Sequence, residues 1–357
     1  MPYPDVSTVS LVIEEKASVL DVQLHNHRTR DIALAAQVIG PDKTKVILRS
    51  LLGLCPVAQV CAFDSAWQAV KNQTANSTDE TTRQLITAEA ILETIRVLSM
   101  DLQPYTIHGK VSTETLKTIG ELRSRLCRIT QNETVDDAAV QTLIEDIRAL
   151  VILWFTREKI AINAIKHTFE RFDDITVDGK ALLFPEEIGN KEILKLFVHI
   201  LTEYPDWALC PQLAGSRITG ALARIRSLQN AGRRQPFRVK DLILARLQEL
   251  KSFASGLISP FTAQSFYLDN GWGVGLVETA RGSLMHFLSL KDNAMQFHIV
   301  APTEWAFQEE SPMVEVMNTY ANKRVHAVKS VVTGLNLIGC AFDPCTKMTV
   351  CWPQRNI

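Results

Sequence analysis

The feature of this sequence that most constrains its fold is a long central region of helical periodicity between two strand-rich ends. One apolar stripe is longer than the others and predicts a single helix over about 135–169. Its members are Val140, Leu143, Ile147, Leu150 and Trp154. The same kind of spacing predicts helices over 192–202, 217–228 and 239–253. The centre of the chain is therefore expected to form a helix bundle.

Both ends of the chain carry strand patterns. Val9, Leu11 and Ile13 recur at every second position, and the pattern continues over 19–24. Towards the other end, 284–290 and 295–300 flank Lys291-Asp292-Asn293 and predict a hairpin. We predict an α+β fold, predominantly helical, whose strand-rich N- and C-terminal parts pack on the helix bundle as one domain over residues 1–357.

Composition and charge argue against several classes of protein. The formal net charge of the 357-residue chain is −1, so no overall positive field favours nucleic acid or an anionic membrane. The sequence has no apolar run long enough to cross a bilayer and no secretory signal in its first twenty residues. The seven cysteines are an odd number and do not form a disulfide framework. We therefore expect a cytoplasmic protein with reduced thiols and no membrane insertion.

Three short stretches carry residue types suited to a thiolate site. The first, over 49–59, contains Cys55-Pro56, and proline is favoured in the first helical turn, so Cys55 is expected at a helix N-terminus. That position favours the thiolate form of a cysteine. The second stretch, over 273–286, supplies glycines and Arg281. The third, over 342–351, contains Asp343-Pro344-Cys345, where a turn can aim the cysteine inward.

Taken in order, these stretches resemble the motifs of the large subunit of NiFe hydrogenases, in a reduced form. In the family's first cysteine motif, Gly53 and Cys55 match, whereas Leu52 replaces a cysteine and Gln59 replaces the histidine. A second family motif has matches at Glu278, Arg281, Gly282, Leu284 and His286. The resemblance extends over nearly the whole chain.

The remaining two motifs lie nearer the C-terminus. Pro302, Thr303 and Trp305 match the family's Pro-Thr/Ser-x-Trp-Asn motif. In the terminal motif, the matches are Asp343, Pro344 and Cys345. Met348 replaces the second cysteine of that motif, and Cys351 replaces its histidine.

The replaced residues are as informative as the matched ones. In the catalytic family, four cysteines bind a nickel–iron centre, and this chain keeps one cysteine of each pair. Leu52 cannot bind a metal, and the neutral thioether of Met348 is a poor replacement for a bridging thiolate. The pattern therefore resembles the HupK/HoxV family of hydrogenase accessory proteins, which are relatives of the large subunit implicated in maturation.

The resemblance implies an assembly scaffold and not an enzyme. Cys55 and Cys345 would hold iron as an Fe(CN)2CO precursor; two thiolates suffice for a lone iron but not for the family's nickel site. Arg281 and Thr303, which follows Pro302, would donate hydrogen bonds to the cyanide nitrogens. Cys351 remains open as a third metal ligand or a resting thiol. The implied partners are a HypC-like chaperone, a HypD-type scaffold and the precursor of a hydrogenase large subunit.

Alternatives to these interpretations stay open at this point. The chain could be a divergent catalytic hydrogenase, which the residues at Leu52 and Met348 oppose, or a metal-free docking chaperone in the maturation complex. Free cysteines are commonly small buried hydrophobic residues. Core packing is the preferred interpretation for Cys61, Cys127, Cys210 and Cys340.

Overall fold

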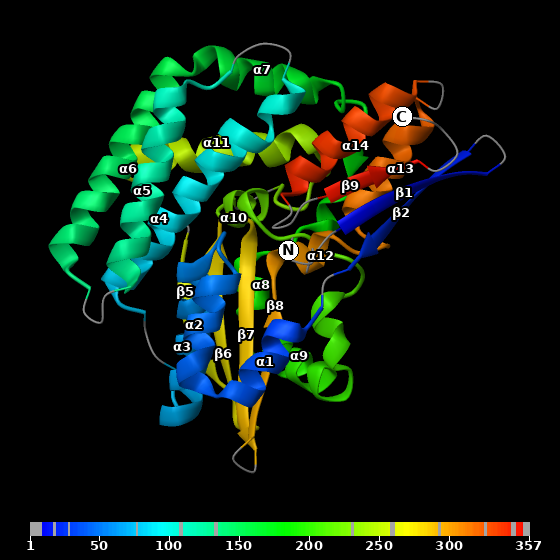
Figure 1. Cartoon of the computed structure of the whole chain (residues 1–357). Helices are drawn as coiled ribbons and strands as arrows, with labels where there is room; N and C mark the ends of the chain where they lie inside the picture. Colours follow the sequence, from blue (N-terminus) through cyan, green and yellow to red (C-terminus); the bar gives the residue numbers. More distant parts are fainter. Residues whose placement is uncertain are drawn as a thin grey trace, which may run out of the picture.

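The computed structural model describes residues 9–352 except 17–18, 28, 76–77, 107–109, 132–134, 230–231, 258–260, 292–293, 325–326 and 344–347. Figure 1 shows three groups of elements: a bundle of long helices, a four-stranded sheet flanked by helices, and a three-stranded sheet that joins the two ends of the chain. The predicted α+β fold, predominantly helical, is confirmed.

The helix bundle forms the central part of the chain, as the periodicity predicted. It consists of α4 (Glu80–Arg96), α5 (Thr113–Gln131), α6 (Asp137–Arg157), α7 (Lys159–Glu170) and α11 (Val239–Ala254). A π-helical turn, η1 (Val97–Asp101), continues α4, and the short 3-10 helix η2 (Gln103–Tyr105) follows it. The helices predicted over 192–202 and 239–253 are present as α9 (Lys191–Glu203) and α11.

The single long helix predicted over about 135–169 is wrong, because α6 ends at Arg157 and α7 begins at Lys159. Glu158 separates them and leaves the helical conformation. Its buried carboxylate turns toward the start of α5, where it accepts hydrogen bonds from the Ser112 hydroxyl at 2.8 Å and the Thr115 hydroxyl at 2.8 Å. Because Glu158 caps α5, the chain leaves the helical conformation between α6 and α7, although the apolar stripe alone would continue as one helix.

The four-stranded sheet is antiparallel, in the order β5-β6-β7-β8, and includes the predicted hairpin. Its strands are β5 (Ala263–Tyr267), β6 (Trp272–Thr279), β7 (Gly282–Lys291) and β8 (Ala294–Val300). On one face lie α1 (Asp31–Ile39), α2 (Pro41–Leu51) and α3 (Pro56–Asn72). The other face packs on α9, on the 3-10 helix η4 (Pro205–Leu209) and on α12 (Pro302–Ala306).

Two glycines of β6 bring α3 unusually close to the sheet. Gly273 and Gly275 point to the α3 face, whereas Val274 and Leu276 between and beyond them belong to the apolar cluster on the α9 face. A Cβ atom at Gly275 would overlap the carbonyl oxygen of Ala62 in α3, and one at Gly273 would overlap that of Ala66. Since α3 begins next to Cys55, this packing also fixes where Cys55 lies.

The two ends of the chain form one sheet, in the order β2-β1-β9. Strand β1 (Val9–Lys16) pairs antiparallel with β2 (Val19–Asn26) and parallel with β9 (Met348–Cys351). This sheet packs against α13 (Pro312–Asn322) and α14 (Val328–Phe342).

Short elements connect the three groups. They are β3 (Thr176–Val177), η3 (Gly179–Ala181), α8 (Pro185–Ile188), α10 (Ala221–Ser227) and β4 (Phe237–Arg238). The helix predicted over 217–228 shrinks to α10, because Ile218 pairs with Leu182 in a β-bridge and Gly220 adopts a φ of 114°. Within the part of the chain that the structure describes, none of the helices combines the length and apolar character needed to span a bilayer.

Candidate functional site

Cys55 lies immediately before the first turn of α3, as the following proline predicted. It is the N-cap residue, and Pro56 occupies the first helical position. Two amide groups of this helix end bond to a residue of another helix. Val57 N–H and Ala58 N–H donate to the two carboxylate oxygens of Glu89, at 2.8 Å and 2.9 Å. Glu89 of α4 thus occupies the helix N-terminus beside Cys55.

Glu89 should make the stability of the protein depend on pH. Burial raises the pKa of Glu89 from 4.5 to about 8, although the amides of Ala58 and Val57 oppose the shift. The folded state then keeps a proton that the unfolded state has lost, so the free energy of unfolding should fall as the pH rises from 4.5 to about 8. Urea titrations of the wild type and of Glu89→Gln across this range test the prediction. An equally steep fall in the variant would contradict it, because a glutamine does not titrate.

A hydrogen-bonded chain of side chains leads from Cys55 into the sheet. Gln59, one turn along α3, donates its Nε2–H to Cys55 Sγ at 3.7 Å. Its Oε1 lies 2.8 Å from Nε2 of His286 in β7. His286 is fully buried, and burial lowers its pKa to about 3, so the ring is neutral at physiological pH. With its Nε2–H donated to Gln59, the histidine orients the amide so that a donor faces the sulfur.

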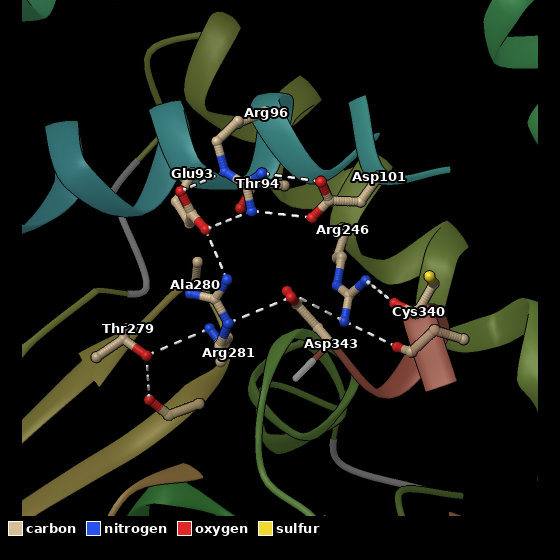
Figure 2. Close-up of polar contacts among 12 residues, drawn as sticks. Glu93, Thr94, Arg96, Asp101, Arg246, Thr279, Ala280, Arg281, Cys340 and Asp343 are labelled. Atoms are coloured by element: carbon tan, nitrogen blue, oxygen red, sulfur yellow. Dashed lines mark hydrogen bonds and ion pairs between the residues drawn. The ribbon is translucent and has the colours of Figure 1, made fainter. Parts of the chain in front are cut away.

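Arg281 is the centre of a buried charge cluster at the β6–β7 turn. Its Nη2 lies 2.6 Å from Glu93 Oε1, and its Nε lies 3.2 Å from Asp343 Oδ1 (Figure 2). Arg96 contacts the same glutamate at 2.9 Å, and Arg123 contacts it as well. Burial opposes ionisation of Glu93, but hydrogen bonds from Arg96 and the charge of Arg281 hold its pKa at about 2. Glu93 is therefore a permanent anion that fixes Arg281.

Asp343 is the last described residue before the segment that contains Cys345. It ends α14 in the left-handed conformation, with φ of 59°, and it is 3% exposed. Arg246 of α11 lies 3.5 Å from Asp343 Oδ2 and donates to the Ala341 carbonyl at 2.8 Å (Figure 2). Two guanidinium groups, from Arg246 and Arg281, thus hold the end of α14. Cys345 itself lies outside the described residues.

A small cavity adjoins Arg281 and Arg246. Its volume is about 20 Å³, enough for one water-sized group, and Pro302 forms part of its lining. In the next residue, Thr303, the buried hydroxyl oxygen has no hydrogen-bond partner among the described residues. An unpartnered buried hydroxyl is unfavourable unless a ligand or water completes it. The cavity therefore has room for a water-sized group that accepts hydrogen bonds from the two guanidinium groups, and Thr303 is not among its lining residues.

Comparisons with known proteins agree with this arrangement of motifs. No family model matches the chain. The chain is 25% identical over 311 residues to hydrogenase expression/formation protein HupK of Bradyrhizobium diazoefficiens, covering 84% of this chain and 83% of that protein. It is also 25% identical over 277 residues to HupV of Azotobacter chroococcum, covering 74% and 75%. The chain is similar to the hydrogenase expression/formation proteins. The resemblance to HupK and HoxV proteins is thereby confirmed.

The structure of this chain is similar to solved structures of hydrogenases. The Ni-Fe-Se hydrogenase from D. vulgaris Hildenborough superposes with a TM-score of 0.56 and 13% identity, covering 92% of this chain and 94% of that one. The Ni-Fe-Se hydrogenase from Desulfomicrobium baculatum gives a TM-score of 0.56 and 13% identity, covering 93% and 95%. At this identity the likeness establishes the fold alone. It confirms the predicted fold, that of the hydrogenase large subunit, over most of the chain.

The two residues that replace cysteines in this HupK-like chain are packed against apolar surroundings. Leu52 contacts the apolar cluster around α1, α2 and α3. The thioether of Met348 lies against Gly339 of α14, where a Cβ atom would overlap it. Both positions therefore serve packing in this structure.

The other cysteines divide into half-buried and exposed ones. Burial raises the pKa of Cys61 and of Cys340 to about 12, so both remain thiols, as expected for packing residues. Cys127 and Cys210 are exposed, which contradicts the predicted core role. Cys351 is exposed on β9 opposite Val12, and it stays a tentative ligand. Among the described residues, which do not include Cys345, no group of three or more Cys, His, Asp or Glu could hold a metal ion.

The sequence analysis missed most of the charged residues that surround Arg281. Glu89, Glu93 and Arg246 interrupt helix faces that are otherwise apolar and buried. A charged residue inside such a face is the signal that could have found them, because burial requires a partner. A second buried cluster was also missed: Arg224 of α10 bonds to Glu249 at 2.7 Å and to Glu278 at 2.9 Å.

Proposed function

We propose that this chain is an accessory protein of hydrogenase maturation, and that it holds an iron ion with cyanide and carbonyl ligands while the active site of the enzyme is assembled. The names of its relatives, which are hydrogenase expression/formation proteins, support the maturation role. Cys55 and Cys345 would supply two thiolates to the iron. Two separate observations support the proposal: Arg281 presents a buried guanidinium group, and the buried Thr303 hydroxyl has no hydrogen-bond partner among the described residues.

The two charged residues that line the small cavity, Arg246 and Arg281, are both cationic. The guanidinium groups of Arg96, Arg123, Arg246 and Arg281 meet the carboxylates of Glu93, Asp101 and Asp343. These guanidinium groups exceed the carboxylates by one, but Glu249 also acts on Arg246, and it belongs with Arg224 and Glu278 to a neighbouring cluster that carries one excess negative charge. An iron(II) ion that binds two cyanides and two thiolates is a net anion. Two guanidinium groups at the cavity would favour an anionic complex over a bare metal cation.

The polarity of the hydrogen bond to Cys55 also supports thiolate binding. Gln59 presents an N–H to the sulfur, and an N–H donor stabilises a thiolate or a metal-bound sulfur more than it stabilises a thiol. An amide neither takes up nor releases a proton at physiological pH, so this contact orients the ligand without titrating. A contact that exchanges no proton suits a protein that binds the iron complex without catalysing a reaction on it.

We infer that the protein is not a hydrogenase. Nickel in the catalytic family needs the two cysteines that are Leu52 and Met348 here, and both residues pack against apolar groups. The proposed partners are a HypC-like chaperone, a HypD-type scaffold and the precursor of the large subunit, each of which would give or receive the iron complex.

Infrared spectroscopy of anaerobically purified protein tests the proposal. The chain is co-expressed with hydrogenase maturation proteins, and the wild type is compared with Cys55→Ala, Cys345→Ala and the control Cys61→Ala. We expect bands of bound cyanide and carbonyl in the wild type and in the control, and their loss in the two other variants. If the wild type lacks these bands although its relatives load under the same conditions, the iron proposal is wrong.

Thr303→Val should change the environment of the bound complex without lowering the stability of the protein. Valine has the shape of threonine but no hydroxyl, and the Thr303 hydroxyl lacks a partner within the described part of the chain. The free energy of unfolding of the unloaded protein should stay the same or rise by up to about 1 kcal/mol. In the loaded protein, the cyanide bands should shift because one hydrogen bond is lost. Unchanged bands together with unchanged stability would remove Thr303 from the site.

A further inference from the structure

A long groove on the helix bundle lies between α11 on one side and α6 and α7 on the other. Its volume is about 880 Å³. The floor is apolar and is formed mainly by Phe155, Ile162, Leu244 and Leu247. The residues that line each wall recur three or four positions apart, so the α11 wall is one helical stripe and the other wall combines a stripe of α6 with a stripe of α7. The groove contains none of the residues assigned to the iron site.

The rim of the groove is basic. Lys159, Lys166 and Lys251 line it, and none of its lining residues is acidic. Within the described residues, these three lysines form no ion pair with a carboxylate. Most other exposed lysines and arginines of the bundle do have such partners, for example Arg125 with Asp146 and Arg157 with Glu114. A local excess of three positive charges in a chain of net charge −1 is therefore concentrated around an apolar floor.

We propose that this groove binds an amphipathic helix of a partner protein whose apolar stripe is flanked by carboxylates. An apolar floor between two helices is the shape into which a third helix fits. Carboxylates on both sides of the stripe would meet the lysines of both walls. The α11 wall extends over 244–255, which is about 16 Å at 1.5 Å per residue, so the groove accommodates about three turns of a helix.

The charge of the groove also argues against a second copy of this chain as its occupant. A symmetric dimer formed through the groove would bring the same three lysines of both copies together. The repulsion between like charges would oppose that arrangement. An acidic helix from a different protein is favoured by the same charges.

The groove lies back to back with the iron site across α11. Leu244 and Leu247 of this helix line the groove, whereas Arg246 between them contacts Asp343. The proposal does not depend on iron binding, because it follows from the groove alone. A test with unloaded protein therefore separates its failure from failure of the proposed function.

Binding of a designed peptide tests the groove. The probe is a fluorescein-labelled helical peptide of about four turns, with leucines at every third or fourth position and glutamates beside them. A second peptide carries lysines in place of the glutamates. Fluorescence anisotropy is measured with the wild type, with the double variant Lys159→Glu/Lys166→Glu, and with Ile152→Gln, which changes an exposed residue of the groove wall. The matched control is Lys191→Glu/Arg128→Glu, two charge reversals at exposed positions on α9 and α5.

We expect saturable binding of the acidic peptide that weakens at least about tenfold in the double lysine variant and as salt rises, with little change in the control. Ile152→Gln should weaken binding several-fold, and circular dichroism should show that all variants are folded. Three results would overturn the proposal: no saturable binding, equal binding of the lysine peptide, or equal binding to the double variant. Dimerisation of the wild type that Ile152→Gln abolishes would also overturn it, because the occupant would then be a second copy.

Discussion

Replacing Gly275 with alanine is expected to lower the free energy of unfolding by about 3 kcal/mol or more. The new Cβ would overlap the carbonyl oxygen of Ala62, which is helix backbone and cannot rotate away. To relieve the overlap, α3 must move off the sheet or β6 must bend. Because α3 begins beside Cys55, the shift should also reduce retention of the proposed iron complex at temperatures where the variant is folded.

A matched glycine provides the control for this experiment. Gly53 lies two residues before Cys55, and a Cβ atom there would meet nothing within 4 Å. Gly53→Ala should change stability by less than about 1 kcal/mol, in either direction. Urea denaturation of both variants gives the comparison. If Gly275→Ala unfolded at the same urea concentration as the wild type, α3 could not be as close to the sheet as the structure shows.

Replacing Arg281 with methionine should cost about 3–5 kcal/mol of stability and, if the proposed function is correct, abolish retention of the iron complex. Methionine fills similar space but leaves the carboxylates of Glu93 and Asp343 buried without their shared cation. Arg123→Met is the control, because the Arg123 side chain is 27% exposed, whereas that of Arg281 is 5% exposed. Its loss should cost only about 1 kcal/mol.

The pH dependence of the Arg281→Met variant gives an independent check. In the wild type, the pKa of Glu93 is about 2, below its ordinary value of 4.5. The contribution of Glu93 to stability is therefore present above pH 4.5 and is lost as the pH falls toward 2. Without Arg281, the pKa of Glu93 should rise, and stability should fall less steeply between those values. An unchanged acid profile would show that Arg281 contributes little to the ionisation of Glu93.

The sequence predicted those elements whose pattern is local. The alternation of β1 and the stripe of α11 are set by neighbouring residues, and both elements are where they were expected. Pro56 likewise placed Cys55 at a helix N-terminus. In contrast, the break between α6 and α7 depends on Ser112 and Thr115 of a distant segment, which draw the Glu158 carboxylate inward. Such a contact cannot be read from the periodicity of the helix that it interrupts.

The candidate site shows the same division. Family motifs pointed to Arg281, Thr303 and Asp343, but not to Glu93, which also contacts Arg281. Glu93 and Asp343 lie far apart in the chain, and Asp343 was noted only as a part of a motif. Which cation meets which buried carboxylate is decided by how α4, α11 and α14 pack, and no spacing in the sequence encodes that.

The parallel pairing of β1 with β9 has a consequence for when cargo can be received. Val9 pairs with Met348, so β1 obtains one of its two neighbouring strands only after residue 348 has been synthesised. During translation, β1 can pair only with β2, and Cys55 leaves the ribosome long before Cys345 does. Contacts between such distant residues form late in folding. If both thiols are needed to bind the iron, loading must wait until synthesis has passed Cys345, and a shorter nascent chain cannot capture the complex.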